Sequence, residues 1–370
     1  MRRTAVSKHN PIFARNLEKY DFIMADLSQF DPNSVGLLSN NVFGLPFSEE
    51  EARLVLLPVP WEVTVSYNNG TARGPEHIFR ASFQVDLYDA DVKDGWKQGF
   101  YMREPDKHLL LRSDYLRKEA ELYLKFLTEG GDISENEFLK KTLVDVSNGT
   151  RAMNEWVYTQ TKALLEKGKL VGLVGGDHST PLGFFKAIGE HKGEFGILQI
   201  DAHCDLRDAY EGFKYSHASI MFNALAEVPQ LSKLVQVGIR DYCEEEVDYI
   251  NNSEGRVVTF FDKQIKERQF EGESWKAICD SIVAALPQQV YISFDIDGLD
   301  PKLCPHTGTP VAGGFEAEQV YYLFKKVLES GRKLIGFDLN EVSTSHDEWD
   351  ANVGARVLFK LCNLLISSNS

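Results

Sequence analysis

The sequence predicts an α/β fold in which helices cover both faces of a mostly parallel sheet. Short runs rich in Val, Ile, Leu and Phe recur along the chain. They lack the polar alternation of half-exposed strands, which is typical of strands buried on both faces. Longer segments with helical patterns separate these runs, as expected for repeated βαβ units. We predict strands at 52–58, 170–174, 195–200, 234–237, 257–261, 290–294 and 333–337.

The predicted helices alternate with these strands from the middle of the chain to its end. Residues 51–370 are expected to form a single domain, and residues 1–50 an N-terminal extension packed on its core. The charged, irregular segment 94–145 is expected to be an insertion or peripheral layer with a helix near 113–128. The remaining helices are predicted at about 151–167, 181–190, 218–227, 242–251, 274–286, 316–330 and 353–366.

The composition limits the compartment and the partners. The chain has 55 acidic and 40 basic residues, for a formal charge of −15. Such a chain is a poor match for nucleic acid, whose binding relies on Lys and Arg, and it suits small cationic ligands better. The five cysteines form no CxxC pair, and there is neither a signal peptide nor an apolar stretch of membrane-spanning length. We therefore expect a cytoplasmic protein without a membrane or nucleic-acid partner.

Three polar clusters directly follow three of the predicted strands. They read GGDHS at 175–179, DAHCD at 201–205 and DIDGLDP at 295–301. In open α/β sheets, ligands bind outside the carboxyl ends of the strands. The three clusters are therefore expected to meet at one edge of the sheet.

Alternation along an extended chain predicts which of these side chains converge. Asp201, His203 and Asp205 would point the same way, and so would Asp295 and Asp297. Four carboxylates at one edge repel each other, and two divalent cations would cancel their charge. Oxygen and nitrogen ligands without cysteine favour Mn²⁺ or another borderline-hard ion over structural zinc, and two such ions can acidify one shared water. We predict a two-metal centre with the ligands His178, Asp201, His203, Asp205, Asp295 and Asp297.

Simpler roles exist for each cluster taken alone. A lone Asp or His after a strand is usually a loop residue or a helix N-cap, and Asp177 can be such a residue. The glycines at 175 and 176 resemble the start of a phosphate loop, but no GK[ST] follows them. The three clusters together, in this order on this strand pattern, favour the metal centre.

The clusters GGDHS, DAHCD and SFDIDGLDP resemble the three motifs of the ureohydrolase family, which includes arginases, agmatinases and formimidoylglutamases. The resemblance extends from about residue 51 to 366 and includes weaker matches at 70–75 and 336–342. It implies a three-layer αβα sandwich, a homotrimer or homohexamer, and hydrolysis of a guanidino compound by a metal-bridging hydroxide.

The resemblance also implies a role for each ligand. His178 and Asp205 would bind one ion, while Asp201 and Asp295 would bridge both. The other ion would be bound by His203 and Asp297.

Two further residues resemble catalytic residues of the family. His217, in the segment Tyr-Ser-His at 215–217, is similar to the proton-transfer histidine of agmatinases, a task that suits imidazole. Glu341 follows the last predicted strand, like the family glutamate that binds the guanidinium, and carboxylates pair bidentately with that cation. The simpler roles are a surface or core histidine and a helix-capping acid. Asp205 would accept or pass a proton in the same reaction.

The resemblance leaves the substrate open. The segment 201–217 is similar to agmatinases, with Arg207 where arginases place an Asn for the substrate amino acid group. This favours an agmatine-like substrate. The segment 60–67 and the N-terminal extension are similar to agmatinase-like proteins that include nickel-dependent guanidine hydrolases. Thr64 and His306 would narrow the pocket there, or are ordinary loop residues.

Further alternatives remain. Within the family they are an arginase, a guanidinobutyrase and a formimidoylglutamase. From other classes they are a ureohydrolase-like regulatory binding protein, which would lose ligands, and a zinc deacetylase, which keeps a single-metal set.

Overall fold

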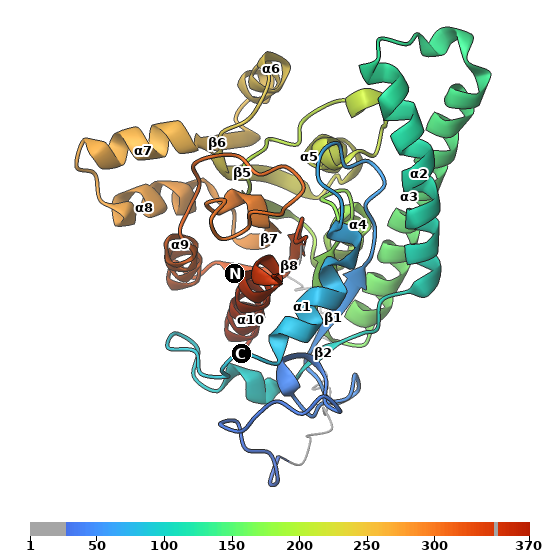
Figure 1. Ribbon diagram of the computed structural model, residues 1–370. Coiled ribbons are helices and arrows are strands. Elements are labelled where there is room, and N and C mark those ends of the chain that lie inside the picture. Colours follow the sequence, from blue (N-terminus) through green and yellow to red (C-terminus); the bar gives the residue numbers. More distant parts are fainter. Residues whose placement is uncertain (1–26, 344–346) are drawn as a thin grey trace, which may run out of the picture.

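One parallel sheet forms the centre of the part of the chain that the computed structural model describes, residues 27–343 and 347–370 (Figure 1). Every pair of neighbouring strands in it is parallel. The strands are β1 (Leu54–Val59), β2 (Phe100–Met102), β3 (Leu170–Gly175), β4 (Phe195–Ile200), β5 (Leu231–Ile239), β6 (Val257–Phe261), β7 (Gln289–Asp295) and β8 (Lys333–Asn340). Their order across the sheet is β2-β1-β3-β8-β7-β4-β5-β6.

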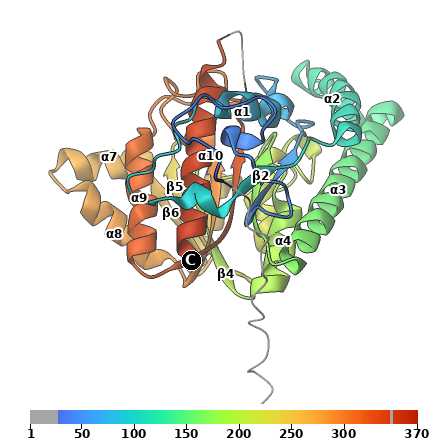
Figure 2. The ribbon, with the colours of Figure 1, turned by 90° about the horizontal axis from the view of Figure 1, so that it is seen from below.

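Helices cover both faces of this sheet (Figures 1 and 2). One layer contains α1 (Gly74–Ser82), α7 (Asp262–Phe270), α8 (Trp275–Ala285), α9 (Ala317–Glu329) and α10 (Trp349–Ser368). The other contains α2 (Lys107–Thr128), α3 (Glu137–Glu166), α4 (Leu182–Lys192), α5 (Ile220–Glu227) and α6 (Glu244–Asn252).

The side chains of each strand alternate between the two buried cores. In β1, Leu54 and Leu56 belong to one core, whereas Val55 and Leu57 belong to the other. Because both faces of the strand are covered, its sequence is apolar at every position. The predicted α/β class and the three-layer αβα sandwich are confirmed.

The predicted strands are all present, with ends that differ by a few residues, and so is the helix predicted near 113–128. The segment 94–145 is nevertheless more regular than predicted. Strand β2 in this segment pairs with β1 at the edge of the sheet. Helix α2 begins at Lys107 instead of near 113, because Asp106 caps it by accepting hydrogen bonds from the backbone N–H groups of His108 and Leu109. Helices α1 and α7 were not among the predicted elements.

Helix α3 begins at Glu137, well before the predicted start near 151. Gly149 lies in its interior, where glycine usually weakens a helix. A Cβ atom at this position would overlap the side chain of Leu116 on α2. The glycine therefore permits close packing of α2 against α3.

The predicted N-terminal extension lies outside the described residues as far as position 26. In its described part, Val42, Phe43, Leu45 and Phe47 are buried in the core. This part of the extension packs on the domain. The division into an extension, a domain and an insertion otherwise remains a prediction.

The strand order places the three polar clusters side by side. Strands β3, β8, β7, β4 and β5 are neighbours in the middle of the sheet, so their carboxyl ends form one continuous edge.

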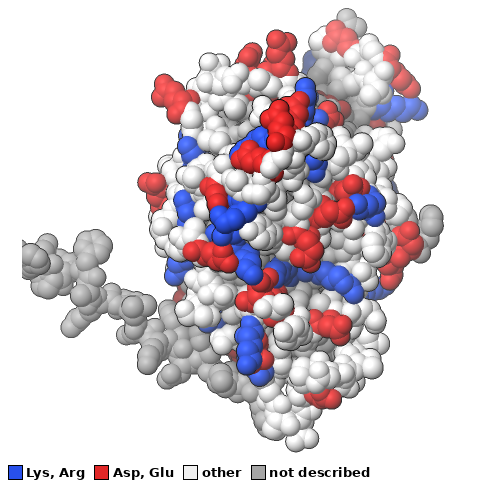
Figure 3. Space-filling model, turned by 90° about the vertical axis from the view of Figure 1, so that its left-hand side faces the viewer, with Lys and Arg blue, Asp and Glu red and all other residues white. Residues whose placement is uncertain are grey.

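On the face shown in Figure 3, basic side chains lie among acidic ones. Among the described helices, none combines the length and apolar character needed to span a membrane.

Candidate metal centre and substrate pocket

The carboxyl edge of the sheet brings together the predicted ligands from three strands. His178 follows β3, Asp201 follows β4, and Asp295 is the last residue of β7. Each of these three residues is at most 3% exposed. Buried ionisable groups at adjoining strand ends need mutual compensation or a bound ion, because burial of an unpaired charge is costly.

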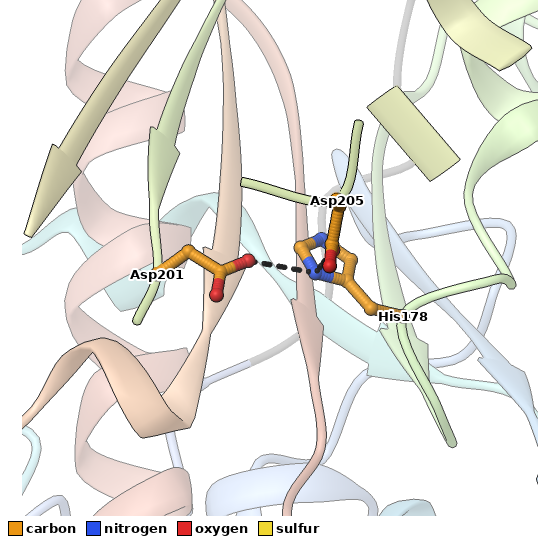
Figure 4. A group of neighbouring side chains, drawn as sticks. All are labelled: His178, Asp201 and Asp205. Carbon is orange, nitrogen blue, oxygen red and sulfur yellow. Dashed lines mark ion pairs between the residues drawn. The ribbon is translucent and has the colours of Figure 1, made fainter. Parts of the chain in front are cut away.

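The first ligand group surrounds Nδ1 of His178. This atom lies 3.0 Å from Oδ2 of Asp201, 3.0 Å from Oδ2 of Asp205 and 3.3 Å from Oδ2 of Asp295. Figure 4 shows the side chains of Asp201 and Asp205 approaching the same edge of the His178 ring. Among the described residues, neither Nδ1 of His178 nor Oδ2 of Asp205 has a hydrogen-bond partner. The ring nitrogen and the carboxylate oxygens thus gather at one point, which is the arrangement expected around a cation.

The second group surrounds Nδ1 of His203. This atom lies 3.0 Å from Oδ2 of Asp297 and 3.6 Å from Oδ1 of Asp201. Oδ2 of Asp297 is buried without a hydrogen-bond partner. Asp201 thus directs one oxygen to each histidine, as a bridging ligand would. Asp295, the other implied bridge, lies beside His178.

The backbone brings these side chains together by turns, and the expected alternation along an extended chain is wrong. Asp205 has a φ of 55°, in the left-handed region. The backbone N–H of His203 donates to Oδ1 of Asp201 at 2.6 Å, and that of Asp297 donates to Oδ1 of Asp295 at 2.8 Å. In both clusters the first aspartate accepts a hydrogen bond from the residue two positions later, which turns the chain.

Side chains that the sequence analysis did not identify hold the ligands in place. Nε2 of His178 lies 2.9 Å from Oγ of Ser293, which donates to Oδ1 of Asp338 at 3.0 Å. Because the serine hydroxyl donates to Asp338, Nε2 carries the histidine proton and Nδ1 is free to bind a metal ion. Nε2 of Gln199 donates to Oδ2 of Asp201 at 2.8 Å. These three residues lie on strands, but no local pattern distinguishes them from other buried polar residues.

The electrostatics also favour a bound cation. Burial, together with the charge of Asp201, raises the pKa of Asp205 to about 7. Burial, together with Asp297 and Asp201, raises the pKa of Asp295 well above its ordinary value. Burial alone would lower the pKa of His178, but the surrounding carboxylates outweigh it and raise that pKa. Negative charge therefore exceeds what the protein itself compensates, and the donor set fits two divalent cations.

A cavity of about 350 Å³ opens onto this centre. Among the predicted site residues, six line it: His178, His203, Asp205, His217, Asp295 and Glu341. The cavity is also lined by residues to which no sequence motif assigned a site role, including Ser66, Tyr67, Tyr210, Asp241, Tyr242 and Thr309. Asp241 comes soon after β5. It could therefore have been predicted as a site residue, because ligands bind outside the carboxyl ends of the strands.

Glu341 presents a free carboxylate oxygen in the cavity. Its φ of 61° turns the chain after β8, and its Oε1 accepts a hydrogen bond from the backbone N–H of His178 at 2.9 Å. Oε2 is buried and has no hydrogen-bond partner in the described part of the chain, and a Cβ atom at Gly308 would lie 2.7 Å from it. Burial, with the charge of Asp177, raises the pKa of Glu341 well above its ordinary value. A cationic ligand would compensate this carboxylate.

His217 lies in the wall of the cavity and is only 9% exposed. Its backbone N–H donates to Oγ1 of Thr64 at 3.1 Å, and its Nδ1 lies 3.3 Å from both Oγ1 of Thr64 and Oγ of Ser216. Burial, together with the nearby His203 and His178, lowers the pKa of His217 to about 3. The imidazole is therefore neutral near pH 7.

Neither Thr64 nor His306 is among the described residues that line the cavity. Thr64 instead holds His217, and Nδ1 of His306 lies 2.9 Å from Oδ1 of the buried Asp350. Asp177, for which the sequence also allowed an ordinary loop or capping role, has such a structural role. Its Oδ1 accepts hydrogen bonds from the backbone N–H and the hydroxyl of Ser179. This turn leads into α4.

Arg207, which the sequence analysis singled out in the segment 201–217, also lines the cavity. Nε of Arg207 lies 3.3 Å from Oε2 of Glu246, and its guanidinium carbon lies 5.4 Å from the centre of the Tyr210 ring. Asp241, on the same wall, has a side chain that is 69% exposed. Glu246 thus compensates Arg207, and Oδ2 of Asp241 lies 3.9 Å from Nε2 of His203.

Comparisons with known proteins give a family match over most of the chain. The sequence profile of the Arginase family matches residues 52–363. The chain is 31% identical over 304 residues to the N(1)-aminopropylagmatine ureohydrolase of Thermus thermophilus, covering 80% of this chain and 84% of that protein. It is 26% identical to the agmatinase of Bacillus anthracis, covering 82% and 88%. The crystal structure of agmatine ureohydrolase of Thermoplasma volcanium superimposes with a TM-score of 0.63 at 21% identity, covering 85% and 90%.

Proposed function

The chain belongs to the arginase family, and we propose that it is a ureohydrolase acting on a small cationic guanidino compound. The proposed reaction cleaves a C–N bond of an agmatine-like substrate and releases urea and an amine. One observation carries the proposal: the unpartnered Oε2 of Glu341 lies at the same cavity as the two ligand groups. A buried carboxylate beside a metal centre can hold a guanidinium with its carbon next to that centre.

The proposed cofactor is a pair of divalent cations, with Mn²⁺ preferred and Ni²⁺ as the alternative. Oxygen and nitrogen donors without a thiolate support this choice. When bound, such ions lower the pKa of a shared water and supply positive charge where negative charge develops. The proposed ligands are His178, Asp201, His203, Asp205, Asp295 and Asp297, whose side chains form the two groups described above.

The protein's own residues have separate proposed tasks. Glu341 binds the guanidinium and orients its carbon. Asp205, whose Oδ2 has no hydrogen-bond partner, accepts or passes a proton of the attacking water. His217 lines the same cavity and relays a proton to the leaving nitrogen as the C–N bond breaks. The new C–O bond remains in urea.

The substrate is tested by measuring urea release in a panel of compounds, with Mn²⁺ and Ni²⁺ compared. Agmatine is expected to be the best substrate, and aminopropylagmatine is also expected to release urea. Guanidine as the best substrate would identify the alternative, a guanidine hydrolase that releases urea and ammonia. Preference for arginine or guanidinobutyrate, or formamide release from formimidoylglutamate, would indicate those branches of the family.

Metal content separates the proposal from other classes of protein. Two ions per chain are expected, whereas a deacetylase would hold one and a regulatory binding protein none. His203→Ala should lose one ion and most urea release. A fully active His203→Ala variant would contradict the proposal.

We also propose a cytoplasmic homotrimer or homohexamer. Five cysteines without a disulfide among them support a reducing compartment. Light scattering of the purified protein tests the oligomeric state.

A further inference from the structure

Helix α2 contacts two loops that form the wall of the cavity. It packs along α3 at one side of the molecule (Figure 1). One loop, residues 60–70, follows β1 and contributes Ser66 and Tyr67 to the cavity. The other, residues 206–219, follows the second polar cluster and contributes Tyr210 and His217. Neither loop contains a described helix longer than a single 3-10 turn, so their shape depends on contacts with other elements.

Arg117 of α2 makes the largest set of contacts with the first loop. Its guanidinium donates from Nη2 to Oδ1 of Asn69 at 2.7 Å, and from Nη1 to the carbonyl oxygens of Val63 and Val65. Glu121, one turn further along α2, accepts from Nε at 3.0 Å. The residue is only 9% exposed. A buried guanidinium with its donors occupied on both sides fixes the backbone at 63–69.

Other residues on the same face of α2 also contact the first loop. Ser113, one turn before Arg117, accepts a hydrogen bond at 3.0 Å from the backbone N–H of Glu62. Residues spaced by four lie on one face of a helix, so Ser113, Arg117 and Glu121 all face the first loop. The loop in turn contacts the opposite wall, where the backbone N–H of Asn68 donates to the carbonyl of Gly308 at 3.0 Å.

Thr64 connects the first loop to the second. It lies between the two carbonyl groups that Arg117 binds, and its Oγ1 accepts the backbone N–H of His217 at 3.1 Å. The orientation of His217 therefore depends on a loop segment whose position Arg117 fixes.

Tyr123 of α2 supports the second loop directly. Its hydroxyl donates to the carbonyl oxygen of Glu211 at 3.0 Å, and its ring lies 5.1 Å from that of Phe213. Ala209 and Glu211 both have a φ of 52°, a conformation that residues other than glycine rarely adopt. A loop in this conformation requires outside contacts to hold it.

From these contacts we propose that Arg117, although it lies outside the cavity, is a positioning residue that sets the cavity wall at 63–69 and the orientation of His217. The inference rests on the proposed function, because it assigns Arg117 a part in that reaction. Helix α2 then controls both how the substrate fits and how well His217 is aligned. A displacement of about 1 Å caused far from the reacting atoms can reduce a rate by about 100-fold.

The test compares Arg117→Ala with Arg112→Ala, which removes an exposed guanidinium from the same helix. Hydrogen exchange measured by mass spectrometry should become faster in segments 62–70 and 213–220 of Arg117→Ala only. Urea release should show kcat/KM lower by about 10- to 100-fold, with two metal ions retained. Arg112→Ala should match the unaltered protein in every measurement.

Two further variants keep the test decisive if Arg117→Ala does not fold. Arg117→Lys keeps the charge but offers one nitrogen, so it should change exchange and kcat/KM in the same direction by a smaller factor. Tyr123→Phe removes one hydrogen bond and should affect segment 206–219 alone. A folded Arg117 variant with unchanged exchange in 62–70, or with unchanged kcat/KM and only a lower Tm, overturns the inference.

Failure of the proposed function gives a different result. In that case the unaltered protein releases urea from none of the compounds. Hydrogen exchange needs no substrate, so it still decides whether Arg117 positions the loop and His217.

Discussion

Nδ1 of His178 lies 3.0 Å from Oδ2 of Asp201, although the strands that precede these residues, β3 and β4, are not neighbours in the sheet. Strands β8 and β7 lie between them and contribute Glu341 and Asp295 to the same edge. The centre is therefore formed across four adjacent strand ends, and each of its parts can be tested separately.

Asp201→Asn should disrupt both ion sites, because among the described carboxylates only Asp201 directs an oxygen to each histidine. We expect metal content to fall below two ions per chain and urea release to fall by about 100-fold or more. Elemental analysis and urea assays measure the two effects. Asp208→Asn, which changes an exposed acid in the following loop, is the control. Full metal content in Asp201→Asn would show that Asp201 does not bridge.

Ser293→Ala should weaken metal binding without removing a ligand. The hydroxyl of Ser293 joins Nε2 of His178 to Asp338 and so fixes the histidine proton. Loss of such support typically costs about 10- to 100-fold in metal affinity. Competition with a chelator measures this affinity. Ser281→Ala, on helix α8, should leave it unchanged, and equal affinities in both variants would refute the role of Ser293.

Glu341→Gln should separate substrate binding from metal binding. The substitution keeps the shape of the side chain but removes the charge that faces the guanidinium. Removing one partner of a buried charge pair costs about 2–5 kcal/mol, which predicts a fall in kcat/KM of at least about 30-fold. Metal content should stay at two ions. Glu348→Gln is the exposed control, and a Glu341→Gln protein with unaltered kcat/KM would exclude Glu341 as the guanidinium ligand.

Removal of divalent ions should lower the thermal stability. Chelation leaves four buried carboxylates at one edge of the sheet with only His178 and His203 to compensate them, and their mutual repulsion destabilises the folded state. Restoring a metal at about 100 times its Kd should add about 2.7 kcal/mol of stability. Differential scanning calorimetry with and without Mn²⁺ measures this change. The Asp201→Asn protein should respond less, and an unchanged Tm after chelation would argue against a bound ion in the folded protein.

Gly149→Ala should destabilise the protein although alanine is the better helix former. The added methyl group would overlap Leu116, and overpacking of this kind costs about 1–3 kcal/mol, against about 1 kcal/mol gained in helix propensity. Urea denaturation measures the difference. A more stable Gly149→Ala protein would show that α2 can move away from α3 at little cost.

The sequence was sufficient to predict the residues that directly follow strands. His178, Asp201 and Asp295 each stand at a strand end, so the strand pattern alone places them at one edge. It was misleading for Asp205 and Asp297, since backbone turns replace the extended alternation there. Asp205 and Asp297 nevertheless lie near the centre as predicted, because the turns that precede them start at Asp201 and Asp295.

Contacts between distant segments could not be predicted in this way. Arg117 binds a loop about fifty positions earlier in the chain, and nothing in its own helix indicates this partner. Ser293 looks like any buried strand residue until its neighbour Asp338 is known. The start of α3 was missed because Gly149 weakens the local helical pattern while improving the packing with α2.

The insertion of β7 and β8 between β3 and β4 has a consequence for how the protein is made. A nascent chain that has emerged only as far as β6 has Asp201 and His178 but lacks the strands that separate them. The ribosome must release the C-terminal segment before the edge can close, so the proposed metal ligands come together only late in biogenesis. A chain terminated prematurely in this region would expose two unpaired strand edges, which are targets for aggregation and proteolysis.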